Sequence, residues 1–221
     1  MNHPAFKGDQ KHGDSLLSRK ERKLLDPLVT KIPIWIKSYH LTLSSLLWSF
    51  LIILFSYFAK QNINWMWLVS FVILLQYLTD YFDGTVGRYR KEGLIKWGYY
   101  MDHFLDYIFL SSILGGYFIL VDGVYKYYVF SMLVILVGFM INSFLYFSVS
   151  EKFNIYYFKL GPTEERIILI IVNSLIVFYG KSILEHGLPY MLGALMIMLI
   201  YIVYNTQKEI WLIDLEKKNH L

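Results

Sequence analysis

The sequence predicts an all-α integral membrane protein in which six transmembrane helices follow an amphipathic interfacial helix, with both termini in the cytoplasm. Three observations support this fold class. The chain of 221 residues is 56% hydrophobic and only 17% charged, which would leave too much apolar surface uncovered in a soluble domain. It also contains six apolar stretches of roughly membrane-spanning length, and most of its Lys and Arg residues lie on one side of them.

Short polar connectors separate the six predicted spans. A helix needs about 20 apolar residues to cross the hydrocarbon core of a bilayer. Within lipid the backbone must satisfy its own hydrogen bonds, so helices are expected rather than open sheet. The expected spans are residues 41–59, 64–82, 99–121, 125–149, 163–180 and 187–207.

The distribution of Lys and Arg predicts the orientation of these spans. With the N-terminus inside, eight of these residues precede the first span, four lie in 84–98, three in 150–166 and three after the last span. The other side would carry only Lys60, Lys126 and Lys181. Because cytoplasmic segments are enriched in Lys and Arg, both termini and residues 84–98 are expected to face the cytoplasm.

Residues 15–38 are predicted to lie on the membrane surface as a basic amphipathic segment. Apolar residues such as Leu24 alternate with cationic residues such as Arg22, a pattern typical of interfacial helices. Pro27 and Pro33 are expected to break the helix. The alternative is a partly disordered basic tail that is attracted to anionic lipid.

The chain is expected to form one membrane domain with short flanking segments. Its length suits a single domain. The absence of Cys excludes disulfides, thiolate catalysis and Cys-ligated zinc. The expected parts are a flexible tail (1–14), the amphipathic segment (15–38), the six-span domain (39–208) and a cytoplasmic tail (209–221).

Two pairs of aspartates stand out against this apolar background: Asp80 with Asp83, and Asp102 with Asp106. Spacings of three and four residues place each pair on one face of a helix. The first three could be interface or helix-capping residues, but Asp106 lies a full turn further in, among apolar neighbours. Four carboxylates that meet inside a membrane would repel one another and lose hydration unless divalent cations hold them. The pattern therefore predicts a metal site and phosphate chemistry.

The segment from Asp80 to Asp106 resembles the signature of the CDP-alcohol phosphotransferases, also called CDP-alcohol phosphatidyltransferases: D-x2-D-G-x2-A-R-x8-G-x3-D-x3-D. The four aspartates, two glycines and the arginine all occur in this order. Gly87 replaces the usual alanine, and nine residues rather than eight separate Arg88 from Gly98. The first change exchanges one small residue for another, and the connecting loop is expected to absorb the second.

The resemblance implies a role for each matching residue. Two divalent ions, Mg²⁺ or Mn²⁺, would lie among the carboxylates of Asp80, Asp83, Asp102 and Asp106. Asp106 would also be the general base. Gly84 and Gly98 would leave room for the cytidine nucleotide, and Arg88 would contact its diphosphate. Family members often carry P-N-x-L-T at the first span, so Thr42 is a candidate nucleotide contact, with helix capping or bonding to the preceding turn as the alternative.

A Gly161-Pro-Thr-Glu164 stretch opens the fifth predicted span. It is typical of a well-formed helix start. Similar stretches occur in the family, including the aminoalcohol phosphotransferases, so Glu164 and Arg166 are candidate acceptor-pocket residues. Members that make phosphatidylglycerophosphate or phosphatidylinositol phosphate tend to carry a G-K-x-K-T-like stretch instead, which favours an aminoalcohol or small-polyol product here. His103 points away from the aspartate face and is expected to serve packing or to lie at the interface.

The resemblance implies an enzyme of phospholipid biosynthesis that moves a phosphoalcohol or phosphatidyl group from a CDP-alcohol to an acceptor hydroxyl and releases CMP. Its expected partners are CDP-diacylglycerol or a CDP-aminoalcohol, a hydroxyl acceptor, the lipid bilayer and a second copy in a homodimer, without nucleic acid. The site would face the cytoplasm, in either a bacterial inner membrane or the endoplasmic reticulum.

Two other classes of protein remain as alternatives. UbiA-like prenyltransferases also bind Mg²⁺ and diphosphate with two aspartate-rich motifs, but they usually have more spans and more distant motifs, whereas only 18 residues separate Asp83 from Asp102. A non-enzymatic divalent-cation transporter would use the aspartates as its ion site. Against it, the acidic residues gather at one end of the predicted spans rather than near the midplane.

Overall fold

The computed structural model describes residues 17–150 and 161–219, and all regular elements in these ranges are helical. The short elements are α1 (Ser18–Leu25) and the 3-10 helices η1 (Asp26–Lys31) and η2 (Ile63–Trp65). The long helices are α2 (Ser38–Ala59), α3 (Met66–Arg90), α4 (Ile95–Leu120), α5 (Tyr125–Ser150), α6 (Pro162–Tyr179) and α7 (Ser182–Asn219).

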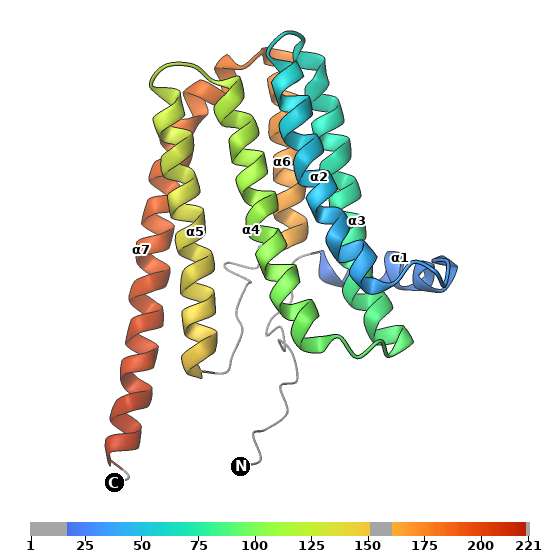
Figure 1. Ribbon diagram of the computed structural model, residues 1–221. Coiled ribbons are helices and arrows are strands. Elements are labelled where there is room, and N and C mark those ends of the chain that lie inside the picture. Colours follow the sequence, from blue (N-terminus) through green and yellow to red (C-terminus); the bar gives the residue numbers. More distant parts are fainter. Residues whose placement is uncertain (1–16, 151–160, 220–221) are drawn as a thin grey trace.

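The long helices form a bundle with two parts (Figure 1). Helix α2 packs against both α3 and α4, and α6 packs against α3. Helices α5 and α7 pair with each other, and α5 also contacts α4. Fully or almost fully buried residues from four helices meet in the apolar core, among them Ile52, Ile73, Ile113 and Ile176. The connection between α3 and α4, the end of α5 and the end of α7 lie at one end of the bundle, which we call the site end (Figure 1).

Helices are present at all six positions where spans were predicted, and five helical segments are long and apolar enough to cross a membrane. These five are Ser38–Ala59, Ile63–Arg90, Ile95–Leu120, Tyr125–Ser150 and Ser182–Leu215. The protein is thus a multi-pass membrane protein by length and composition. Helix α6 is not among these five. It has only 18 residues, and three of them in its first turns are charged: Glu164, Glu165 and Arg166. Its status as a sixth span, and the orientation of the bundle, stay predictions.

Helices α3 and α7 extend well beyond their predicted C-terminal ends. Helix α3 runs on to Arg90, and α7 continues to Asn219, through most of the expected tail at 209–221. Helix α3 ends where Lys91 takes a left-handed conformation, with φ 54°. The connection to α4 is therefore short, so much of the segment that was expected to be a loop is helical.

Helices α2 and α4 approach each other closely at Gly116. A Cβ atom added at this glycine would lie 3.0 Å from Ser56 Cβ and closer still to Ser56 Oγ. Small residues allow such close contact between membrane helices, where dispersion forces rather than the hydrophobic effect hold helices together.

Gly116→Ala is therefore expected to lower the free energy of unfolding by about 1–3 kcal/mol, because the added methyl group overpacks the contact with α2. Gly193→Ala is the matched control, since a Cβ there meets nothing within 4 Å among the described residues. Unfolding of both variants in detergent measures the difference. Equal stability of the two variants would contradict a tight contact between α2 and α4.

The N-terminal segment is helical only in part, and it breaks where the sequence predicted. The α-helix ends at Leu25, and η1 follows with Pro27 in its first turn. Leu24, Ile34 and Trp35 are strongly exposed. This exposure suits a segment on a membrane surface, although its interfacial position stays a prediction, and the tail at 1–14 lies outside the described residues.

Hydroxyl–carboxylate hydrogen bonds attach this segment to the site end of the bundle. Glu21 Oε1 accepts hydrogen bonds from Tyr77 of α3 at 2.8 Å and from Thr163 of α6 at 3.0 Å. The hydroxyl of Tyr81, one turn along α3, donates to Asp26 Oδ1 at 2.6 Å. The N-terminal segment thus lies across α3 and α6 beside the aspartates.

Candidate active site

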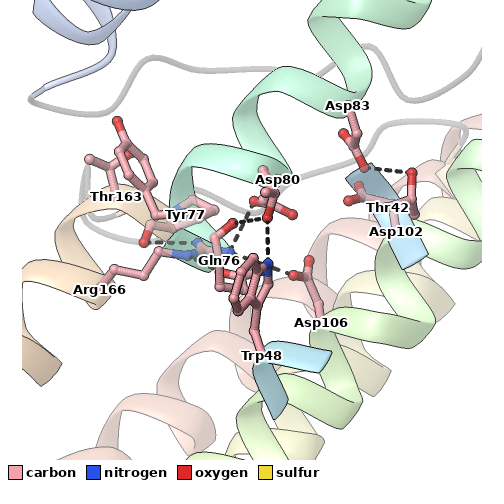
Figure 2. A network of polar contacts seen from close by, with 12 residues as sticks. Thr42, Trp48, Gln76, Tyr77, Asp80, Asp83, Asp102, Asp106, Thr163 and Arg166 are labelled. Carbon is pink, nitrogen blue, oxygen red and sulfur yellow. Dashed lines mark hydrogen bonds and ion pairs between the residues drawn. The ribbon is translucent and has the colours of Figure 1, made fainter. Parts of the chain in front are cut away.

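The four aspartates lie on two neighbouring helices at the site end of the bundle. Asp80 and Asp83 are near the end of α3, and Asp102 and Asp106 are near the start of α4. Figure 2 shows side chains from both helices directed toward a common region, with Arg166 reaching it from α6. The four residues thus lie at the adjoining ends of α3 and α4, and their joint binding of metal stays a prediction.

Asp80 forms an ion pair with a buried arginine. Its Oδ2 atom lies 2.9 Å from Arg166 Nη2, and Arg166 is only 5% exposed. The same nitrogen lies 3.8 Å from Asp106 Oδ1 (Figure 2). The guanidinium of α6 therefore links a carboxylate of α3 with a carboxylate of α4.

Asp83 is the most buried of the four aspartates and contacts α2. Its side chain is 9% exposed, and its Oδ2 atom lies 2.8 Å from Thr42 Oγ1 (Figure 2). The Thr42 hydroxyl also lies 3.1 Å from the Ser38 carbonyl oxygen, so its single proton serves one acceptor at a time. The contact with Ser38 is the bond to the preceding turn that was the alternative interpretation of Thr42. The contact with Asp83 joins Thr42 to a site carboxylate, and contact with a nucleotide stays a prediction.

The start of α2 is fixed by a carboxylate in the connection between α3 and α4. Glu92 Oε2 accepts hydrogen bonds from the Ser38 N–H at 3.0 Å and from the Ser38 hydroxyl at 2.7 Å. Burial opposes ionisation of Glu92, but these bonds, with Lys37 and Arg90 nearby, hold its pKa below its ordinary value. Glu92 thereby anchors the turn of α2 that leads to Thr42.

Thr42→Val is expected to lower the turnover of this site about 10–100-fold, the usual effect of losing a hydrogen bond that orients a metal ligand. Valine keeps the shape of threonine but cannot donate to Asp83. Ser49→Ala is the control, because Ser49 lies on the same helix and its buried hydroxyl makes no hydrogen bond within the described part of the chain. Steady-state rates of product release measure both variants. Unchanged turnover in Thr42→Val would exclude this positioning role.

Asp102, His103 and Asp106 form a group that could hold a metal ion. Each offers one ligand atom, and these atoms lie within 4.8 Å of one another. His103 also packs against the rings of Tyr99 and Phe144, as a packing role predicts, while its Nδ1 atom lies 3.8 Å from Asp102 Oδ2. His103 was predicted to point away from the aspartate face, since neighbouring residues lie about 100° apart around a helix. Its long side chain nevertheless places a ring nitrogen close to the carboxylates of Asp102 and Asp106.

The two glycines and the arginine of the signature lie within helices. A Cβ atom at Gly84 would approach Arg88 Nη1 to 3.1 Å, whereas one at Gly98 would meet nothing within 4 Å among the described residues. The space beside Gly98 is thus open. The exposed Arg88 contacts Thr85 Oγ1 through Nη2 at 3.2 Å. Contacts of these three residues with a nucleotide stay predictions.

Glu164 and Arg166 have definite partners within the protein. The carboxylate of Glu164 accepts hydrogen bonds from the backbone N–H groups of Gly161 and Leu17, each at 2.9 Å. It therefore caps α6 and ties the N-terminal segment to it. Arg166 points to the aspartates. Whether either residue lines an acceptor pocket stays a prediction.

Gln76 is a site residue that sequence reasoning missed. It is 1% exposed, and its Oε1 atom accepts a hydrogen bond from Arg166 Nε at 2.8 Å. A signal was present, because Gln76 is a lone amide in an apolar run, one turn before Asp80. Polar residues inside membrane helices usually have a specific partner.

The donor set of this site fits hard divalent cations. Mg²⁺ and Mn²⁺ prefer carboxylate oxygens, and the four aspartates lie at the adjoining ends of α3 and α4. Asp102 and Asp106 are close enough to share one ion, and Arg166 connects Asp106 with Asp80. The four carboxylates and the one buried guanidinium beside them leave a net negative charge, which bound cations would neutralise. The residues present thus suit the metal-dependent chemistry that the sequence predicted.

Taken together, the fold and the site define a class: helical multi-pass membrane proteins with a carboxylate cluster between helix ends. The family model of the CDP-alcohol phosphatidyltransferases matches residues 35–211, well over half of the chain. The chain therefore belongs to the CDP-alcohol phosphatidyltransferase family, as the aspartate signature predicted, and is a transferase of this general type. No curated protein and no solved structure matches it.

Proposed function

We propose that this protein transfers a phosphoalcohol or phosphatidyl group from a CDP-alcohol to an acceptor hydroxyl, with release of CMP and formation of a phospholipid. The observation that carries the proposal is the family match over residues 35–211, combined with four aspartates on facing ends of α3 and α4. The Gly161-Pro-Thr-Glu164 stretch favours an aminoalcohol or small-polyol product.

Asp80, Asp83, Asp102 and Asp106 would hold two divalent ions, Mg²⁺ or Mn²⁺. When bound, such ions supply charge that stabilises the attacking and leaving oxygens of a phosphoryl transfer. Thr42 keeps Asp83 oriented toward the site, and Arg166 fixes Asp80 from the side of α6.

Asp106 acts as general base in this proposal. Its carboxylate takes the proton of the acceptor hydroxyl, the acceptor oxygen forms a bond to phosphorus, and the bond from phosphorus to the CMP oxygen breaks. The negative charge that develops on CMP is met by Arg88, whose fork of N–H donors suits phosphate oxygens. Gly84 and Gly98 leave space for the nucleotide.

A cytoplasmic position of the site fits this chemistry. Water-soluble nucleotide is made in the cytoplasm, and a lipid substrate can reach the helix ends laterally from the bilayer. The charge asymmetry of the sequence gives the same orientation. We further propose a homodimer in a bacterial inner membrane or the endoplasmic reticulum.

CMP release by the purified protein tests this function. The assay supplies Mg²⁺ or Mn²⁺ and compares CDP-diacylglycerol, CDP-choline and CDP-ethanolamine, each with candidate hydroxyl acceptors. Metal-dependent turnover of one donor supports the proposal and identifies the donor type. If no donor turns over and no CDP compound binds with metal present, the proposal is wrong, and transport of divalent cations becomes the next activity to measure.

A further inference from the structure

Arg166 is a buried cation in direct contact with the aspartate site. Its Nη2 atom lies 2.9 Å from Asp80 Oδ2 and 3.8 Å from Asp106 Oδ1. These carboxylates belong to α3 and α4, whereas Arg166 belongs to α6, 86 residues along the chain from Asp80. One side chain thus bridges both halves of the site.

Groups of the protein itself hold this guanidinium in place. Arg166 Nε donates to Gln76 Oε1 at 2.8 Å, and Nη1 donates to the Pro162 carbonyl oxygen at 3.1 Å. The Phe109 ring centroid lies 5.5 Å from Arg166 Cζ, within the range of a cation–π contact. With Asp80 on the third nitrogen, each nitrogen of the fork has a protein acceptor, so Arg166 is oriented before any substrate binds.

A guanidinium keeps its charge under all ordinary conditions. In the metal-free protein it therefore offsets part of the repulsion among the clustered carboxylates. It also repels a divalent cation that enters the same cluster, because a charge a few ångströms away acts strongly in a partly buried site. Both effects favour the metal-free state over the metal-bound state.

We infer that Arg166 is the built-in counter-cation of the metal site: it stabilises the aspartates without metal and lowers their affinity for divalent ions. The inference rests on the proposed function only in requiring that the aspartates bind metal. It assigns Arg166 a positioning and charge-balancing role through Asp80, in place of contact with the acceptor. This role predicts that substitution of Arg166 raises the affinity for metal, whereas the loss of a residue that supports a metal site usually lowers it.

Binding of Mn²⁺ to the purified full-length protein, without substrate, tests the inference. Free Mn²⁺ is followed by electron paramagnetic resonance during titration. Arg166→Gln is expected to bind Mn²⁺ about tenfold or more tightly than the wild type, since the repelling charge is gone. Arg166→Lys keeps the charge and should stay near the wild-type affinity.

Lys126→Gln is the control for the loss of one positive charge, because Lys126 lies at the start of α5, at the opposite end of the bundle from the aspartates. Its Mn²⁺ affinity should remain close to that of the wild type. Should Arg166→Gln fail to fold, Arg166→Met serves instead. That variant also removes the positive charge but keeps an apolar side chain beside the Phe109 ring, and it should likewise bind Mn²⁺ more tightly.

The outcomes separate this inference from the proposed function. If the wild type binds Mn²⁺ and Arg166→Gln, or its substitute, binds it equally or less tightly, the counter-cation role is wrong while the proposed transfer reaction stands. If the wild type binds no Mn²⁺, the metal site fails and the inference fails with it. The inference is supported only if the variants that remove the positive charge of Arg166 bind Mn²⁺ more tightly than the wild type does.

Discussion

Asp106→Asn is expected to slow CMP release by about 10²–10⁴-fold, the range typical for loss of a general base. Asparagine has nearly the same shape as aspartate but cannot take the proton of the acceptor hydroxyl. It also withdraws one negative charge from the cluster formed with Asp102 and His103. Initial rates at saturating donor, compared with the wild type, measure the loss.

Asp122→Asn is the matched control for this experiment. Asp122 lies in the connection between α4 and α5, at the other end of α4 from the aspartate site, where it pairs with Lys181. Its substitution removes the same charge by the same chemistry and should leave the rate of CMP release unchanged. A loss of activity in both variants would point to general damage, and full activity in Asp106→Asn would remove Asp106 from the mechanism.

The helices could be predicted from the sequence because apolar composition and the needs of the backbone in lipid leave few choices. Five of the six predicted spans correspond to helices with the length and composition to cross a membrane. The sixth predicted span corresponds to α6, which carries three charged residues, Glu164, Glu165 and Arg166, near its start. The amino-acid composition shows that these charges are unfavourable in a membrane, but it does not show which residues pair with them.

The limits of α3 show how packing extends a helix beyond its apolar run. The predicted span ended at residue 82, yet α3 continues through the signature to Arg90. Val86 is fully buried, and a Cβ atom at Gly87 would lie 3.5 Å from Ser38 Cβ, so this part of α3 packs against the start of α2. Such a contact joins residues about fifty positions apart, which a local pattern does not reveal.

The aspartate cluster was predictable because its residues are close in sequence. The i,i+3 and i,i+4 spacings place the side chains, and a short connection brings the two helix ends together. The partners of these aspartates were not predictable in the same way. Thr42 was a candidate either for nucleotide contact or for bonding to the preceding turn, and its bond to Asp83 depends on how α2 packs against α3. The bond from Arg166 to Asp80 likewise depends on the placement of α6.

Arg166→Gln is expected to lower the free energy of unfolding of the metal-free protein by about 3–5 kcal/mol, the usual cost of breaking a buried ion pair by removing one partner. The guanidinium is 5% exposed and makes three hydrogen bonds, so its loss leaves Asp80 as an uncompensated carboxylate in a partly buried site. Unfolding in mixed micelles with a denaturing detergent measures the change.

A double-mutant cycle with Asp80→Asn isolates the ion pair from the packing of the arginine. If the two side chains stabilise each other, the double variant should be more stable than the sum of the single losses predicts, by about 0.5–3 kcal/mol. Lys181→Met, which breaks the exposed pair with Asp122, should change stability little, because water screens such pairs.

Added Mn²⁺ should then stabilise Arg166→Gln more than the wild type, since a more tightly bound ligand adds more to the free energy of unfolding. Additive losses in the cycle would mean that Arg166 stabilises the bundle through Gln76 and Pro162 rather than through the aspartates.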